Sequence, residues 1–106
     1  MNAGCVFCKI VKGEIPARKV YEDKEVLAFH TTRPEAPVHV LVIPKKHITN
    51  LGFATQEDVQ VLGECQVVCG TIAKELGIDG AFKVLSLAGS DAGQSVFHLH
   101  YHVMGG

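Results

Sequence analysis

The sequence has no excess charge of either sign and no long uncharged apolar run. Its 106 residues include 10 lysines and arginines against 11 aspartates and glutamates, for a formal net charge of -1. This balance excludes the strongly basic surface that binds nucleic acids or acidic membranes. No segment reaches the roughly 20 apolar residues of a membrane-spanning helix, and the first residues lack the basic and apolar regions of a signal peptide. We therefore expect a cytoplasmic protein, with entry into the nucleus left open and with neither nucleic acid nor membrane as a partner.

Several catalytic signatures are also missing. The chain has no Gly-x-Ser-x-Gly elbow, no Walker loop and no pair of carboxylates placed for glycoside cleavage. It has no internal repeat and no low-complexity segment, while 47% of its residues are hydrophobic. One domain spanning residues 1–106 is therefore expected, with its function on a single core.

Hydrophobic periodicity predicts five strands and two helices. A short helix is expected over residues 5–12, and a long one from about Thr55 to Leu76 with a cap at Thr55 and a stop at Gly77. The apolar stripe of the long helix is Val59, Leu62, Cys65, Val68, Cys69, Ile72 and Leu76. Strands are expected at residues 17–22, 26–30, 38–43, 82–87 and 98–104. Short links favour antiparallel pairing, so the predicted fold class is α+β, a five-stranded antiparallel sheet with one long and one short helix.

The four cysteines divide into two pairs with different expected roles. Cys65 and Cys69 lie four residues apart in the long predicted helix, where packing in the core is the usual role. Cys5 and Cys8 have the C-x-x-C spacing that allows two thiolates to bind one tetrahedral zinc ion. A lone pair of cysteines is a weak signal, because such a site needs two further ligands.

Three histidines stand at every second position near the carboxyl end of the sequence. In an extended strand, His98, His100 and His102 share one face, while the apolar residues between them occupy the other. A single histidine in such a run is most simply a surface or hydrogen-bonded side chain, whereas three in register indicate a site.

The loop before this strand, residues 89–95, is rich in glycine and hydroxyl groups, which suit either a turn or an anion pocket. Its position beside the three histidines favours phosphate as the bound group. His39, inside the predicted 38–43 strand, needs a polar partner, and a core hydrogen bond is its simplest explanation. A neutral imidazole has a lone pair that can attack phosphorus, and water splits the resulting phosphoramidate. Nucleotidyl or phosphoryl transfer to histidine is therefore the chemistry that these residues favour.

The run from His98 to Met104 resembles the His-φ-His-φ-His-φ-φ signature of the histidine triad (HIT) family. The segments CVFCKIVKGEIPA, APVHVLVIPKKHI and GSDAGQSVFHLHYHVMGG resemble the nucleotide-binding branch of that family, the purine nucleoside phosphoramidases, over nearly the whole chain. The resemblance implies a HIT-like fold whose sheet continues across a homodimer. It also implies a substrate in which adenosine or guanosine monophosphate is joined to an amine. Cleavage would pass through a nucleotidyl-histidine intermediate and would require no catalytic cofactor.

By the same resemblance, His100 is the nucleophile, and we expect its ring to face an open cleft. His102 and His39 would contact the phosphate or support the nucleophile, and His98 would brace the triad. Ser95 would help to protonate the leaving amine. Gly93 and Gln94, together with Ser95, would line the phosphate site. The remaining expected substrate-binding residues are Phe29, His30, Thr31, Thr32 and Leu87.

Two positions depart from the nucleotide-binding branch. Thr31 stands where an aspartate usually bonds the ribose hydroxyls, and Leu87 stands where an asparagine usually lies near the phosphate. A hydroxyl forms weaker hydrogen bonds than a carboxylate, and a leucine forms none. We therefore expect weaker ribose binding and a less polar phosphate pocket.

The resemblance also supplies the two ligands that the C-x-x-C pair lacks. In some members of the family, cysteines like Cys5 and Cys8 bind a structural zinc ion with two histidines, which correspond here to His47 and His98. Other members lack the second cysteine and bind no metal, so the resemblance leaves both outcomes open. A bound ion would tie the opening helix to the sheet.

Three alternatives to a phosphoramidase are compatible with parts of the sequence. A dinucleoside polyphosphate hydrolase shares the triad, although the Gly-Gln-Ser approach and the Gly-Gly exit argue against it. A nucleotide-binding regulatory or scaffold protein with little turnover agrees with Thr31 and Leu87, but keeping every catalytic residue type for binding alone would be costly. A purely structural zinc module would leave His100 and His102 without a role.

Overall fold

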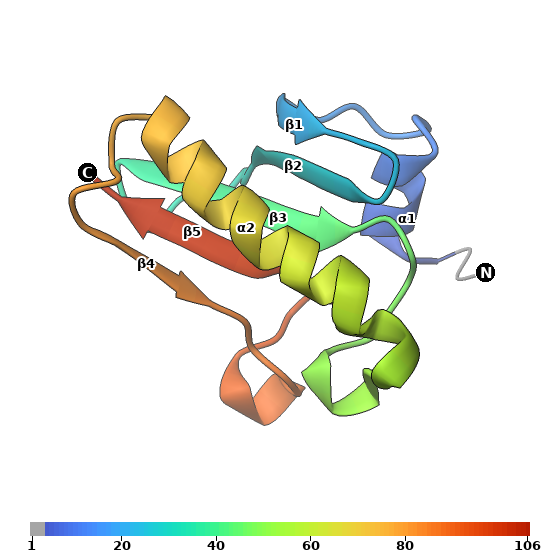
Figure 1. Ribbon diagram of the computed structural model, residues 1–106. Coiled ribbons are helices and arrows are strands. Elements are labelled where there is room, and N and C mark those ends of the chain that lie inside the picture. Colours follow the sequence, from blue (N-terminus) through green and yellow to red (C-terminus); the bar gives the residue numbers. More distant parts are fainter. Residues whose placement is uncertain (1–3) are drawn as a thin grey trace.

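Among residues 4–106, which the computed structural model describes, the chain forms one sheet and two α-helices (Figure 1). The helices are α1 (Val6–Val11) and α2 (Val59–Glu75). The strands are β1 (Lys19–Glu22), β2 (Val26–His30), β3 (Val38–Pro44), β4 (Phe82–Leu85) and β5 (Tyr101–Gly105). Neighbouring strands lie in the order β1-β2-β3-β5-β4, and every pairing is antiparallel. The predicted α+β fold with a five-stranded antiparallel sheet is therefore confirmed.

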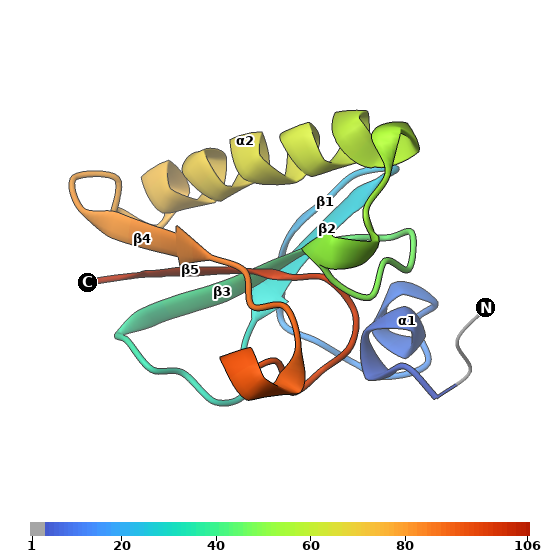
Figure 2. The same cartoon turned by 90° about the horizontal axis from the view of Figure 1, so that it is seen from below.

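The two faces of the sheet carry separate apolar clusters, because side chains along each strand alternate between the faces. In β3, Val40 packs on one face in a cluster with α2 residues such as Cys65. Leu41 packs on the opposite face in a cluster with Phe7 and Ile10 of α1. Figure 2 shows the result, with α2 along one side of the sheet and α1 on the other. The face that carries α1 is the one on which the functional side chains gather.

The long helix ends where the sequence predicts, but α2 begins at Val59, four residues after the predicted start at Thr55. Thr55 and Asp58 form a capping box around a short 3-10 turn, Gln56–Asp58, that leads into α2. Gly77 follows the helix with a φ of +75°, a left-handed conformation that glycine adopts without steric cost. No helix among the described residues 4–106 combines the length and the apolarity needed to span a membrane.

The predicted apolar stripe of this helix is wrong at its first position. Val59 is 60% exposed, whereas Val61 is buried in its place. Each three-residue step along an α-helix falls about 60° short of a full turn. Two such steps separate Val59 from Cys65, so Val59 is rotated away from the sheet. Cys65 and Cys69 are buried in the core as expected.

The strand that carries the histidines is shorter than predicted. β5 begins at Tyr101, so His98 and His100 precede the strand. The Leu99 backbone N–H donates to the Ile48 carbonyl oxygen at 2.6 Å, outside the sheet ladder. The Ser86 hydroxyl donates to the His100 carbonyl oxygen at 2.8 Å, and β4 correspondingly ends at Leu85. The segment stays extended, but loop and side-chain partners replace strand partners.

Candidate active site and metal centre

The alternation predicted for the histidine segment holds although its first residues lie outside β5. Leu99 and Tyr101 belong to the apolar cluster beneath α2. The His98 and His100 rings lie on the other face, where both approach the ring of Phe7. The structure therefore separates an apolar side and a histidine side along one short segment.

The hydrogen bonds of His100 define its neutral tautomer. Its Nδ1–H donates to the carbonyl oxygen of His98 at 2.7 Å, because a carbonyl oxygen can only accept. In the neutral ring the second nitrogen, Nε2, is then unprotonated and carries a lone pair. Burial lowers the pKa of His100, which keeps the ring neutral near pH 7. The expectation that the ring faces an open cleft is not met in this arrangement, since His100 is buried at 7% exposure and the Phe7 ring packs against it.

His39 and His102 form a hydrogen-bonded pair beside the nucleophile candidate. The Nε2 atom of His39 lies 2.9 Å from the Nδ1 atom of His102, and the His102 ring lies 4.9 Å from the His100 ring. His39 and His102 come from adjacent strands, β3 and β5, and their side chains share one face. Burial and the neighbouring His100 and His39 lower the pKa of His102 to about 4, and burial lowers that of His39. Both rings are therefore neutral at pH 7.

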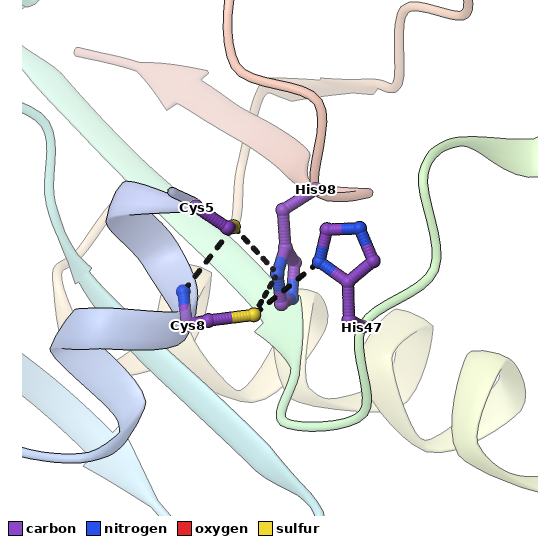
Figure 3. A group of neighbouring side chains, drawn as sticks. All are labelled: Cys5, Cys8, His47 and His98. Atoms are coloured by element: carbon purple, nitrogen blue, oxygen red, sulfur yellow. Dashed lines mark hydrogen bonds between the residues drawn. The ribbon is translucent and has the colours of Figure 1, made fainter. Parts of the chain in front are cut away.

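A second cluster, called here the metal cluster, consists of Cys5, Cys8, His47 and His98. One ligand atom from each residue lies within 4.8 Å of the others. The two thiols extend from the start of α1 toward the two imidazoles, which come from the loop after β3 and from the segment before β5 (Figure 3). The His98 Nδ1 atom lies 3.5 Å from each sulfur atom, and the His47 Nδ1 atom lies 3.3 Å from Cys8 Sγ.

The donor set of the metal cluster fits zinc. Bond lengths of about 2.3 Å to sulfur and 2.0–2.1 Å to nitrogen place tetrahedral sulfur and nitrogen ligands roughly 3.6 Å apart. The separations of 3.3–3.5 Å between sulfur and nitrogen are close to that value. His98 Nε2–H donates to the Pro44 carbonyl oxygen at 2.8 Å, which leaves Nδ1 with the lone pair that a metal requires. Burial raises the pKa of the Cys8 thiol to about 11, so metal binding would displace a proton from it.

The metal cluster lies beside a hollow of about 430 Å³. Cys5 and His47 line this hollow together with Ser95 and Phe97. Both ligands are partly exposed, whereas Cys8 and His98 are buried. The cluster is therefore accessible to an entering ion from one side.

Within the loop at residues 89–95, several N–H groups that an anion pocket would need are already hydrogen-bonded to other protein groups. The backbone N–H groups of Gly93 and Gln94 donate to the carbonyl oxygens of Ser90 and Gly89. The buried Gln94 side chain accepts from Gly89 N–H and Asn50 Nδ2, and donates to two carbonyl oxygens. Gln94 thus organises the loop, and neither its amide side chain nor its backbone N–H is available to phosphate in this arrangement.

The backbone N–H groups that follow Gln94 differ from those within the loop, because they have no backbone partner in the described residues. Within the described part of the chain, those of Ser95 and Val96 have no hydrogen-bond acceptor. Ser95 is exposed, and its hydroxyl also has no partner within residues 4–106. Leu87 packs against Gly93, since a Cβ atom at Gly93 would lie 3.3 Å from Leu87 Cδ1. Leu87 therefore acts here through packing on the loop.

The other predicted substrate-binding residues follow the end of β2 and separate into two groups. Phe29 packs on the histidine face, with its ring 5.4 Å from that of Phe7. Thr31 lies at the same end, because its N–H donates to the His39 carbonyl oxygen at 3.3 Å. The strand alternation places His30 on the α2 face, and Thr32 is exposed. The structure brings Phe29 and Thr31 to the site but not the side chains of His30 and Thr32.

Sequence reasoning missed several residues that shape the site. Phe7 contacts both His98 and His100, yet in the sequence it is only one apolar residue of a short helix. Pro44 and Ser86 bind the histidine segment through a carbonyl oxygen and a hydroxyl, and the Glu35 N–H donates to His39 Nδ1 at 3.0 Å. These contacts join distant segments, and no local pattern signals them.

Comparison with known proteins points to one family. A family model described as "Scavenger mRNA decapping enzyme C-term binding" matches residues 4–106. A HIT-like protein of Synechocystis is 48% identical over 106 residues, which cover 100% of this chain and 93% of that protein. A 14 kDa zinc-binding protein of Zea mays is 41% identical over 103 residues, which cover 95% of this chain and 80% of that protein.

Solved structures give the same result. A histidine triad protein from Clostridium difficile has a TM-score of 0.95 and 48% identity, and the match covers 100% of this chain and 93% of that one. A HIT family hydrolase from Legionella pneumophila has a TM-score of 0.95 and 40% identity, with 97% of this chain and 93% of that one covered.

Proposed function

The chain belongs to the histidine triad family, and from this premise we propose that it hydrolyses purine nucleoside phosphoramidates through a nucleotidyl intermediate on His100. The tautomer of His100 carries the proposal. Its Nδ1–H is bound to the His98 carbonyl oxygen at 2.7 Å, so the lone pair is on Nε2. The hydrolase named among the solved structures supports hydrolysis as the reaction class.

The proposed reaction has two steps that both occur at phosphorus. In the first, His100 Nε2 forms a bond to phosphorus while the bond from phosphorus to the amine nitrogen breaks, and the amine leaves with a proton. Ser95, an exposed hydroxyl of the loop that precedes the histidine segment, would help to supply that proton. In the second step, water attacks phosphorus and the bond from phosphorus to His100 Nε2 breaks, so that His100 regains its lone pair. The proton of the attacking water passes to the group that protonated the amine, and the nucleoside monophosphate leaves.

The His39–His102 pair would stabilise the charge on the phosphoryl oxygens. Because the Glu35 N–H donates to His39 Nδ1, the proton of neutral His39 is on Nε2 and is donated to His102 Nδ1. Neutral His102 then carries its own proton on Nε2, as a donor for a phosphoryl oxygen. The free backbone N–H groups of Ser95 and Val96 are further donors for the same group.

Zinc bound by the metal cluster would supply structural cross-linking and no catalytic step. The name of the zinc-binding relative and the donor set of Cys5, Cys8, His47 and His98 support this proposal. The ligands would join α1, the loop after β3 and the segment before β5. Catalysis itself would need no cofactor.

We also propose that the chain works as a homodimer of single domains. β4 is an edge strand of the sheet, paired only with β5 within the described chain. Phe82 and Val84 on β4 are 37% and 41% exposed, and such an apolar edge suits pairing with a second copy. Purine preference, a cytoplasmic location and the 1–106 domain extent are parts of the same proposal.

Trapping of the intermediate tests the function directly. The protein is mixed with adenosine monophosphate joined to an amine and labelled at phosphorus, quenched at high pH where phosphoramidates survive, and examined for label on the chain. We expect label on His100 in the wild-type protein and none in His100→Ala. Cys69→Ala, which changes the distant core, is the control and should be labelled like the wild type. Rapid turnover with no labelled protein, or labelling that persists in His100→Ala, would refute the proposed intermediate.

A nucleotide-binding protein with little turnover is the second candidate function. The low exposure of His100 and the packing of Leu87 on the phosphate loop favour it. Measurable affinity for AMP without release of amine from any phosphoramidate would establish this reading in place of the first.

A further inference from the structure

One short helix contacts both the metal cluster and the proposed nucleophile. Cys5 caps α1 and Cys8 lies within it, and Phe7 stands between them in the sequence. The Phe7 ring lies edge-on to the His100 ring, with centroids 5.1 Å apart, and at 6.0 Å from the His98 ring. Any displacement of α1 therefore moves a ring that packs against His100.

His98 joins the same two sites through different atoms. Its Nδ1 atom faces the sulfur atoms of Cys5 and Cys8, each at 3.5 Å. Its carbonyl oxygen accepts the hydrogen bond from His100 Nδ1–H at 2.7 Å. The ring of His98 would therefore bind the metal, while the backbone carbonyl oxygen of the same residue fixes the tautomer of His100.

The residues on either side of His47, the remaining metal ligand, bind the His98 ring and the backbone next to it. The Pro44 carbonyl oxygen accepts from His98 Nε2–H at 2.8 Å, and the Ile48 carbonyl oxygen accepts from Leu99 N–H at 2.6 Å. His47 lies between these two acceptors in the sequence and belongs to the metal cluster. The four ligands therefore connect α1, whose Phe7 packs against His100, with the loop after β3 and with the segment that carries His100 itself.

We propose that metal binding by this cluster positions His100 for attack on phosphorus, with His98 and Phe7 as the positioning residues. The proposal rests on the proposed function, and it gives the cluster a role beyond tying α1 to the sheet. Without an ion, thiol contacts of 3.3–3.5 Å are the polar links among these ligands. Coordinate bonds hold ligands far more firmly. A displacement of about 1 Å at a reacting group can slow a reaction roughly 100-fold.

The first test needs no substrate. The full chain is labelled with ¹⁵N in its histidines, and the ring nitrogen shifts of His100 are recorded with zinc bound and after removal of zinc by EDTA. We expect a single tautomer with a protonated Nδ1 in the zinc-loaded protein, and a mixture of tautomers after removal. Failure of the protein to bind zinc would overturn the proposal. The same His100 tautomer in protein that mass spectrometry shows to have lost zinc would also overturn it.

The second test keeps the metal and changes the link. Phe7→Leu keeps an apolar side chain, although a smaller one, and removes the aromatic ring that packs against His100. We expect full zinc content and a KM within roughly twofold of the wild-type value. We expect kcat to fall about tenfold, which is the size of effect seen when a residue that supports a metal ligand is removed. Unchanged kcat in zinc-loaded Phe7→Leu contradicts the positioning role.

A matched control separates positioning from general instability. Val68→Ala removes core volume on the α2 face of the sheet, away from the metal cluster and from His100. Measured well below its unfolding temperature, this variant should keep the wild-type kcat. An equal fall in kcat in Val68→Ala and Phe7→Leu would overturn the proposal. A zinc-dependent His100 tautomer in a protein that cleaves no phosphoramidate would support the positioning link while refuting the proposed function.

Discussion

The His39 Nε2 atom lies 2.9 Å from the His102 Nδ1 atom, and the direction of this hydrogen bond follows from a third residue. The Glu35 backbone N–H occupies His39 Nδ1 at 3.0 Å, so neutral His39 carries its proton on Nε2. His39 therefore donates to His102, and neutral His102 presents its remaining N–H to the site. A backbone group in the β2–β3 loop thus determines which atom of a histidine in the next strand can donate.

Removal of His39 should impair catalysis more than binding. In His39→Leu, His102 loses the donor that fixes its tautomer, and we expect kcat to fall about 10- to 100-fold with little change in KM. Met104→Leu is the matched control, because Met104 pairs with His39 across the β3–β5 ladder and carries no donor for His102. Steady-state kinetics on an adenosine phosphoramidate provide the measurement. A wild-type kcat in His39→Leu would show that the pair has no part in the reaction.

Activity should persist at pH values below the ordinary histidine pKa of about 6.5. Burial, His100 and His39 lower the pKa of His102 to about 4, and burial lowers the pKa of His39. A lowered histidine pKa means that the neutral ring survives as pH falls below its ordinary value of about 6.5. We expect the midpoint of the acid limb of the kcat/KM profile to lie well below pH 6.5. Circular dichroism at each pH verifies that the protein is folded. A midpoint at or above pH 6.5 in folded protein is the contrary result.

Local patterns predicted the elements, but the contacts between distant segments required the structure. Strand alternation separates His100 from Leu99 and Tyr101, and period-two reasoning finds that separation from the sequence alone. Cys8 and His98 lie 90 residues apart and meet only because α1 folds onto the sheet. The C-x-x-C spacing indicated Cys8 and the every-second-position run indicated His98, but only the resemblance to a family placed the two in one metal site. Phe7 and Ile10 look alike in the pattern, and nothing in it signals that the Phe7 ring packs against the rings of His98 and His100.

The Gln94 side chain should contribute stability to the loop before the histidines. Gln94→Leu would remove the hydrogen bonds to the buried Asn50 amide and to the half-buried backbone groups of Gly89 and Thr49. We expect a loss of about 3 kcal/mol in the free energy of unfolding, since each unpaired buried group costs about 1–3 kcal/mol and water compensates some of them. Urea titration measures the loss. The control is Gln60→Leu on the exposed side of α2, where a change of about 0.5 kcal/mol or less is expected.

The cap of α2 should make stability sensitive to acid. Lys46 Nζ lies 2.6 Å from Asp58 Oδ1, and Thr55 N–H donates to the other carboxylate oxygen at 2.9 Å. These bonds, with Lys46 the larger cause, lower the pKa of Asp58 from its ordinary value. A depressed carboxyl pKa stabilises the fold above the unfolded pKa, and the stabilisation disappears as pH falls through the folded one.

Substitution of that carboxylate should therefore matter at neutral pH and not in acid. We expect Asp58→Asn to unfold at lower urea than the wild type at pH 7, with the difference shrinking as pH falls below the ordinary aspartate pKa of about 3.9. Glu57→Gln, an exposed neighbour in the same turn, serves as the control and should follow the wild type. A difference between Asp58→Asn and wild type that stays constant with pH would show that the ion pair contributes nothing.

The ribose site offers a repair experiment. Thr31 Oγ1 already accepts a hydrogen bond from the Arg33 N–H at 3.2 Å, so the hydroxyl has limited capacity to bind a ribose hydroxyl. In Thr31→Asp, one carboxylate oxygen can keep that turn contact while the other accepts from the substrate. We expect a lower KM for an adenosine phosphoramidate with kcat unchanged, which marks an interaction made equally in the ground and transition states. Thr32→Asp adds the same charge at an exposed neighbouring position and should leave KM unchanged. If both variants lower KM alike, the gain comes from charge alone and Thr31 is not at the ribose site.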